Sequence, residues 1–192
     1  LPFVYLIVAL ALSHLSLRER SLHAAYALVG MTSIIFALSY FITAFIQPDT
    51  RIAAHEFAKR VIPTNAAILS EVYDLGITPF NETFHRITLF NFYELDNNSL
   101  EFNEAALEKK LNDSDYLILP SQRILKTRIM HEEQFPNGHT FYTKLLTGKL
   151  GFQKIYETPC DFWCNLTYLG DPIYRLEQTT TVFDRPTLMI FK

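Results

Sequence analysis

The stretch FITAFIQPDTRIAAHEFAKR, Phe41 to Arg60, changes character in its middle. Its first six residues are typical of a helix buried in lipid, and a proline, an aspartate and a partly charged helical pattern follow from Gln47 onward. Asp49 or Thr50 can cap a new helix, because their side-chain oxygens accept hydrogen bonds from the free backbone N–H groups of its first turn. The stretch therefore predicts a membrane span that passes directly into a water-soluble domain.

Charge divides the chain at the same place. Residues 1–46 carry formal charges only at Arg18, Glu19 and Arg20, and these separate two apolar runs, residues 1–17 and 22–46. A helix that crosses ~30 Å of hydrocarbon needs about 17–25 apolar residues. We therefore expect residues 1–46 to form a transmembrane helical hairpin, the last spans of a longer membrane domain. The alternative, a buried core hairpin, is disfavoured because the 25 residues of the second run exceed what so small a domain can bury.

The orientation of the hairpin follows from its turn. Two arginines in residues 18–21 favour a cytoplasmic turn, although Arg51, Lys59 and Arg60 lie just beyond the second run. A signal peptide fits less well, since there is no basic leader and no small-residue cleavage site. We expect an integral membrane protein whose C-terminal domain, residues 47–192, is extracytoplasmic.

The C-terminal domain alternates helical and strand-like segments. In its first helix Ala53, Phe57 and Val61 recur every four residues and predict one apolar face. Further helices are expected from a cap near Asn103 and at residues 140–148. Five apolar segments are typical of strands: residues 66–70, 87–92, 116–119, 152–157 and 188–191. The pattern predicts an α/β sandwich with a mixed sheet, because the irregular connection over residues 71–86 does not resemble a crossover helix.

The chain carries no catalytic motif that we can assign. It has no glycine-rich phosphate loop, no Gly-x-Ser-x-Gly and no His-x-x-x-His pair. The net charge of −3 offers no broad basic surface, so we expect no nucleic-acid partner. We predict no cofactor, no metal site and no catalytic residue within this chain.

Two acids follow the first strand, Glu71 and Asp74. Carboxylates at strand ends often line the crevice of an α/β sheet, so both are candidates for substrate binding. A divalent cation between them is compatible with the chemistry of carboxylates but is not indicated by the spacing. The simpler alternative is that both are solvated or cap a loop.

A basic group, Arg123, Lys126 and Arg128, follows the strand at residues 116–119. A guanidinium matches phosphate oxygens well, so Arg123 is a candidate for substrate binding, against the alternative of a solvated loop. Tyr142 could stack on a sugar ring, although aromatic residues in a small α/β domain usually belong to the core.

The only cysteines, Cys160 and Cys164, lie in the segment CDFWC. Two thiols this close can form a small-loop disulfide outside the cytoplasm, or stay free. A structural zinc site is less consistent with the sequence, because it normally needs four ligands and no second pair follows.

Four segments of the domain resemble, in order, those of one enzyme family. They are PDTRIAAHEFAKRVIPTNAAILSEVYD, SDYLILPSQR, FYTKLLTGKLGFQKIYE and TTTVFDRPTLMIFK, which together cover most of residues 48–192. They are similar to the C-terminal part of bacterial dolichyl-phosphate-mannose–protein mannosyltransferase-like membrane proteins, glycosyltransferase family 39, related to the aminoarabinose transferases. The CDFWCN segment and the insertion YELDNNSLEFNE depart from the family pattern.

This resemblance implies an enzyme that moves a sugar from a polyprenyl-phosphate carrier to an acceptor at the outer membrane face. The lipid-linked sugar donor would be a partner, and the acceptor stays unknown. The family's catalytic aspartate lies in its first external loop, so the catalytic part would be missing from this chain. Two alternatives stay open: a membrane-anchored binding or sensor module without catalysis, and another lipid-linked-sugar enzyme such as an oligosaccharyltransferase, whose Trp-Trp-Asp motif is not found in this sequence.

Overall fold

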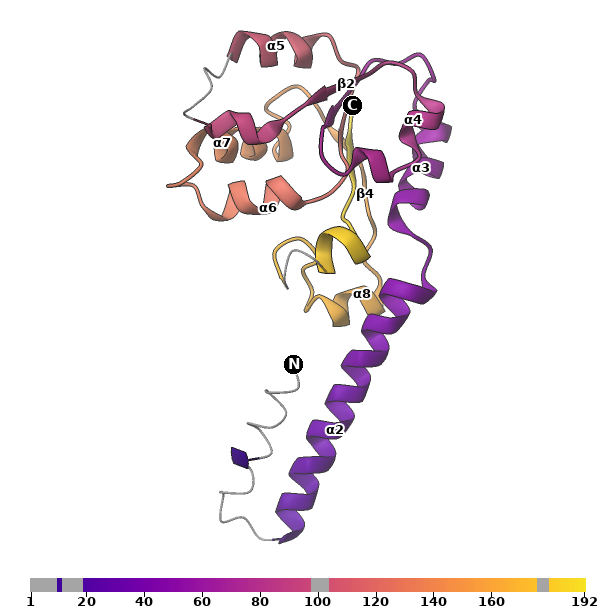
Figure 1. The fold of residues 1–192 in the computed structure, drawn as a ribbon, viewed down its shortest axis with the longest axis vertical. Coiled ribbons are helices and arrows are strands. Elements are labelled where there is room, and N and C mark those ends of the chain that lie inside the picture. The colour runs from indigo at the N-terminus through magenta and orange to yellow at the C-terminus, as the bar shows by residue number, and fades with distance from the viewer. Residues whose placement is uncertain (1–9, 12–18, 98–103, 176–179) are drawn as a thin grey trace.

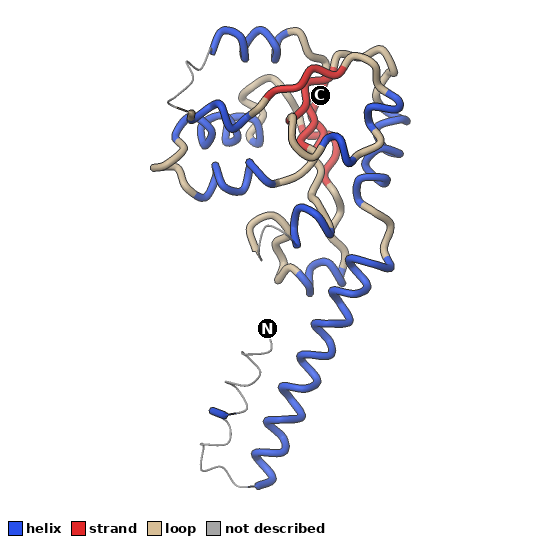
Figure 2. Tube along the Cα trace, viewed as in Figure 1, coloured by secondary structure: helices blue, strands red, loops and turns tan. Residues whose placement is uncertain are grey.

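The computed structural model describes residues 10–11, 19–97, 104–175 and 180–192 (Figure 1). A long N-terminal helix projects from an α/β domain, which holds all the strands found in the described residues (Figure 2). The first apolar run of the sequence, residues 1–17, lies outside the described part of the chain except for residues 10 and 11.

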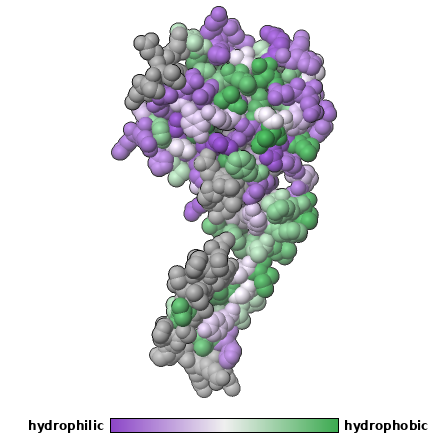
Figure 3. All heavy atoms as spheres, viewed as in Figure 1, coloured by the Kyte–Doolittle hydropathy of each residue, from purple (hydrophilic) through white to green (hydrophobic). Residues whose placement is uncertain are grey.

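The projecting helix is the second apolar run. Helix α2 (Glu19–Phe41) continues into a π-helical segment, η1 (Ile42–Ile46). Ser21–Ile46 is 26 residues long, and its most apolar part has a mean hydropathy of 2.0 and is only 11% buried. Apolar side chains cover its exposed surface below the domain (Figure 3). Within the described residues it is the one helix long and apolar enough to cross a membrane, so it could serve as a membrane anchor.

Helix α3 (Thr50–Val61) begins where the sequence predicts. The Asp49 side chain caps it by accepting a hydrogen bond from the backbone N–H of Arg51 at 2.8 Å. Its expected apolar face is confirmed only in part: Phe57 is partly buried and packs against the core. Ala54 and Ala58 are fully buried, however, whereas Val61 is 43% exposed. The buried face is the one with small side chains, because it lets the helix approach the sheet closely.

The sheet has five strands, β1 (Ile68–Glu71), β2 (Ile87–Phe90), β3 (Tyr116–Leu119), β4 (Lys154–Glu157) and β5 (Met189–Phe191). Their order is β2-β1-β3-β5-β4. Strands β1, β2 and β3 are parallel, whereas β5 is antiparallel to both β3 and β4. The predicted mixed α/β sheet is confirmed.

Helices cover both faces of this sheet. One core cluster joins Leu117 of β3 to helices α5 (Glu104–Asn112), α6 (Arg123–Met130) and α7 (Pro136–Leu146). A second cluster joins the neighbouring residue Ile118 to α3 and α4 (Phe80–Thr83). Consecutive strand residues point to opposite faces, so β3 is buried on both sides, which explains its continuous apolar sequence.

Four short elements complete the domain. They are η2 (Leu75–Ile77), η3 (Phe92–Asp96), α8 (Phe162–Thr167) and η4 (Thr180–Asp184). Helix α8, which the sequence analysis did not anticipate, lies beside the end of α2 (Figure 1). The apolar helix and the α/β domain are therefore joined by packing as well as by the chain.

Candidate functional site

The strand order creates a topological switch point between β1 and β3. The chain leaves β1 for β2 on one side of it and then crosses to β3 on the other side. The connections therefore diverge at the carboxyl ends of β1 and β3, which is where open α/β sheets bind ligands. Glu71 ends β1, and Leu119 ends β3.

Glu71 is buried at this switch point, with only 5% of its surface exposed. Its Oε1 accepts a hydrogen bond from the backbone N–H of Val72 at 3.1 Å, while Oε2 has no hydrogen-bond partner among the described residues. Burial raises the pKa of this carboxyl from 4.5 to about 8, although nearby backbone N–H groups, including those of Tyr73 and Phe92, oppose the shift. At neutral pH Glu71 is therefore mainly a neutral acid, which can donate a hydrogen bond.

Asp74 and Arg123 form a bidentate ion pair at the switch point. Arg123 Nε and Nη2 donate to the two Asp74 carboxylate oxygens at 2.9 and 2.8 Å. Ser121 Oγ donates to Asp74 Oδ2 at 2.5 Å. The Asp74 side chain is 8% exposed and that of Arg123 is 25% exposed, so the arginine is the more accessible partner. The structure thus brings together Glu71 at the end of β1, Asp74 just after it and Arg123 at the start of α6.

Tyr142 lies in the core behind this cluster. It is 1% exposed, and its ring packs against those of Phe92 and Phe141, with centroids 6.1 and 5.2 Å away. The pKa of the Tyr142 hydroxyl is raised well above 10, mainly by burial and to a smaller extent by the nearby Glu71. Because its ring has almost no exposed surface, we do not include Tyr142 in the binding surface proposed below.

A second buried ion pair lies next to the first and was not anticipated. Arg128 and Asp96 are 3.1 Å apart, with side chains 5% and 3% exposed. The Asp96 carboxylate also accepts from the backbone N–H groups of Asn137 and Gly138. A Cβ atom on Gly138 would come within 2.5 Å of Asp96 Oδ2, so only glycine fits there. The basic group that the sequence predicts is thus partly turned inward, since Arg123 and Arg128 both pair with buried acids.

Element η4 connects the switch point to the span. On one side Gln122 Nε2 donates to the Thr181 carbonyl at 2.5 Å, and the Arg123 guanidinium lies 5.3 Å from the Phe183 ring centre. On the other side the Tyr40 hydroxyl of α2 donates to Asp184 Oδ2 at 2.5 Å. Because β5 follows η4 and pairs its first residue with the last residue of β3, the carboxyl end of β3 is the end turned toward the span.

A hollow of about 340 Å³ lies at this junction. Buried Arg185 is part of its lining, and Nη2 of this arginine donates to the Pro159 carbonyl at 2.7 Å. Its Nε and Nη1 have no hydrogen-bond partner among the described residues, and burial lowers its pKa. Other residues of the lining come from η1, the start of α3 and η4: Thr43, Gln47, Asp49, Arg51, Phe183 and Asp184.

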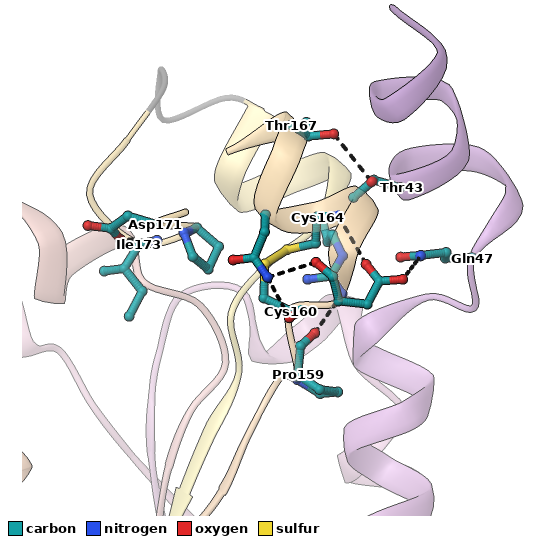
Figure 4. The surroundings of a disulfide bond; sticks show 12 residues. Thr43, Gln47, Pro159, Cys160, Cys164, Thr167, Asp171 and Ile173 are labelled. Atoms are coloured by element: carbon teal, nitrogen blue, oxygen red, sulfur yellow. Dashed lines mark hydrogen bonds between the residues drawn. A yellow bond between two sulfur atoms is a disulfide. The ribbon is translucent and has the colours of Figure 1, made fainter. Parts of the chain in front are cut away.

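Cys160 and Cys164 form a disulfide that closes the first turn of α8 (Figure 4). The Asp161 side chain caps α8 by accepting from the backbone N–H of Cys164 at 3.0 Å. Its other oxygen accepts from Gln47 Nε2 at 2.6 Å. At the opposite end of α8, buried Thr167 lies 3.3 Å from the Thr43 hydroxyl and donates to Ser39 at 3.2 Å.

No cluster of three or more histidine, cysteine, aspartate or glutamate side chains that could hold a metal ion occurs among residues 10–11, 19–97, 104–175 and 180–192. Searches for a family model, a similar curated protein and a similar solved structure each gave no match. Fold and site together define an α/β domain with a mixed sheet, a polar cluster at its switch point, and an apolar helix packed beneath it.

Proposed function

We propose that this chain is the C-terminal portion of an integral membrane glycosyltransferase that moves a sugar from a polyprenyl-phosphate carrier to an acceptor. In this proposal the α/β domain lies outside the cytoplasm and covers the membrane part, which supplies the catalytic residues. Two of the four family-like segments, SDYLILPSQR and TTTVFDRPTLMIFK, contribute Arg123 and Phe183 to the same contact. The disulfide fits an oxidising compartment.

The observation that carries the proposal is the link through η4. Within this one element, Phe183 contacts the switch point and Asp184 contacts the span. A switch point turned toward the membrane surface is where the polar head of a lipid-linked sugar would be presented. A soluble substrate would need no such placement.

The exposed arginine and the buried acid would have different roles. The contact with Asp74 engages Nε and Nη2 of Arg123, so Nη1 lies outside it and can bind a phosphate or sugar oxygen. Glu71, neutral at pH 7, can donate a hydrogen bond once substrate binding exposes it. We assign the general base of the reaction to neither residue.

The test is sugar transfer by the full reading frame in proteoliposomes, with radiolabelled polyprenyl-phosphate sugar as donor. Arg123→Gln is expected to raise the donor KM by about tenfold, since one charge-assisted hydrogen bond is lost. The control is Arg60→Gln, on the exposed side of α3, which should leave KM and kcat unchanged. Unchanged kinetics after deletion of residues 66–192 would refute a role for the domain, and absence of transfer by the wild type would refute the reaction.

One observation favours the alternative, a membrane-anchored binding module without catalysis. The switch-point cluster is complete within this chain, because Glu71, Asp74, Ser121 and Arg123 need no further segment to come together. A soluble ligand that binds the isolated chain through Arg123, with no sugar transfer by the full reading frame, would favour this module over the enzyme.

A further inference from the structure

Helix α8 runs alongside the end of the apolar helix and in the opposite direction. Its first capping residue, Asp161, is level with Gln47, just past the end of η1. Its last residue, Thr167, is level with Thr43 and Ser39 (Figure 4). The turn that follows, Tyr168–Gly170, therefore lies beside a part of the helix that belongs to the apolar run.

The length of the apolar helix can be compared with the thickness of the bilayer to estimate the depth of this turn. At about 1.5 Å per residue, the 26 residues of Ser21–Ile46 span ~39 Å, against ~30 Å of hydrocarbon. The excess of ~9 Å corresponds to about six residues, close to the interval from Ser39 to Ile46. If the excess lies at the domain end, α8 is level with the lipid headgroups.

Side chains on and around α8 suit that environment. Phe162 is 70% exposed and Leu169 is 60% exposed, and the half-buried Trp163 packs edge-on against Phe162. Leu169 also adopts a left-handed backbone conformation, with φ of 53°, which leucine rarely does. A soluble turn would place asparagine or glycine at such a position, whereas a turn in contact with lipid gains from an apolar side chain.

We propose that α8 and its turn form an interfacial anchor, in which Phe162, Trp163 and Leu169 insert among the lipid headgroups and fix the domain on the bilayer. Aromatic side chains concentrate at that level of a membrane. The charged groups Asp171 and Arg175 follow directly in the sequence, so the turn reaches the interface and does not enter the hydrocarbon centre. Helix α8 packs against the apolar helix, and therefore its partner is the same lipid bilayer. This inference rests on the proposed membrane span.

Trp163 is the only tryptophan of the chain, which provides a direct probe. The chain is reconstituted in phosphatidylcholine nanodiscs with a nitroxide placed either near the headgroup or near the end of the acyl chain. We expect the shallow nitroxide to reduce Trp163 emission by about half, and the deep one to have little effect, since the ring resides at the interface.

Two variants separate anchoring from folding. Leu169→Asn keeps a residue that tolerates the left-handed conformation but removes the apolar side chain. It should abolish most of the shallow quenching of Trp163 while leaving the circular dichroism spectrum unchanged. Leu89→Asn, at a leucine that is 45% exposed on β2, is the matched control and should leave the quenching unchanged.

A second tryptophan position separates this inference from the proposed span. In a Trp163→Phe background, Phe36→Trp places the probe near the middle of the apolar helix. Deep quenching of residue 36 with no quenching of Trp163 would overturn the anchor and retain the span. No quenching at either position would overturn both, and equal shallow quenching of Trp163 in wild type and Leu169→Asn would show that Leu169 does not insert.

Discussion

The switch point and the α8 region depart in opposite ways from an ordinary soluble domain. At the switch point, charged groups such as Asp74 and Asp96 are buried in contact with arginines. Around α8, large apolar side chains such as Phe162 and Leu169 are exposed. In the first region, a buried charge that lost its partner would strongly destabilise the domain. In the second region, exposed apolar side chains are unfavourable in water and are typical of an interaction surface. The difference is what we would expect if, as proposed above, the switch point binds a polar ligand and the α8 region contacts lipid.

The largest expected effect breaks the buried pair. Arg128→Ala leaves Asp96 buried without its cation and should lower the free energy of unfolding by about 3–5 kcal/mol. Denaturant unfolding in detergent measures the effect. The matched exposed pair is Lys59–Glu56, with side chains 45% and 57% exposed, and Lys59→Ala should cost less than about 1 kcal/mol. Equal costs for the two variants would contradict the buried pairing.

The next effect concerns the protonation of Glu71. Its pKa is raised on folding, so its contribution to stability is complete below pH 4.5 and is lost as pH rises through about 8. Between about pH 6 and pH 9 the free energy of unfolding should fall by on the order of 2–3 kcal/mol from this group. Glu71→Gln, neutral at every pH, should remove that part of the pH dependence. A variant with the same slope as the wild type would place the titration elsewhere.

Loss of the disulfide tests the α8 region. Cys160→Ser with Cys164→Ser should lower the free energy of unfolding by about 2 kcal/mol, because the closed loop is short. Thermal unfolding of the wild type with and without reductant supplies the comparison. If reduction and the double substitution both leave the melting temperature unchanged, the disulfide does not stabilise this region.

The smallest expected effect tests the contact between α8 and the apolar helix. Thr167→Val keeps the shape of the side chain but removes its hydroxyl contacts with Ser39 and Thr43, which should cost about 1 kcal/mol. Phe162→Ser should leave the free energy of unfolding in detergent nearly unchanged, since the Phe162 side chain is 70% exposed and packs little against the domain. Thermal unfolding of the two variants side by side measures both, and a larger loss for Phe162→Ser would reverse the roles given to these residues.

Local sequence signals predicted most of the fold. All five strands were expected from short apolar runs, and the cap at Asp49 from its side chain. The buried face of α3 was predicted only in part: Phe57 packs against the core as expected, but close packing to the sheet buries Ala54 and Ala58 and leaves Val61 exposed. Helix α8 could not be predicted, because its six residues are too few to show a helical repeat of apolar side chains.

The site was predictable only in part. Glu71 and Asp74 could be predicted as site residues, because they are acids at the end of the first strand and ligands generally bind at strand ends in α/β sheets. The partners Ser121 and Asp96 could not be predicted from the sequence. Ser121 lies 47 residues from Asp74 in the chain. The contact of Asp96 with Arg128 depends on which side of α6 faces the domain. The link through Phe183 likewise arises only when η4 lies between the sheet and the span.

Photo-crosslinking tests the central claim most directly. The chain in nanodiscs is irradiated with a photoreactive polyprenyl-phosphate sugar, and the labelled peptides are identified by mass spectrometry. The account predicts labelling of peptides that contain Arg123 or Phe183, competed by unlabelled polyprenyl-phosphate sugar and reduced in Arg123→Gln. Labelling confined to the apolar helix, or labelling of the domain that Arg123→Gln leaves unchanged, would contradict it.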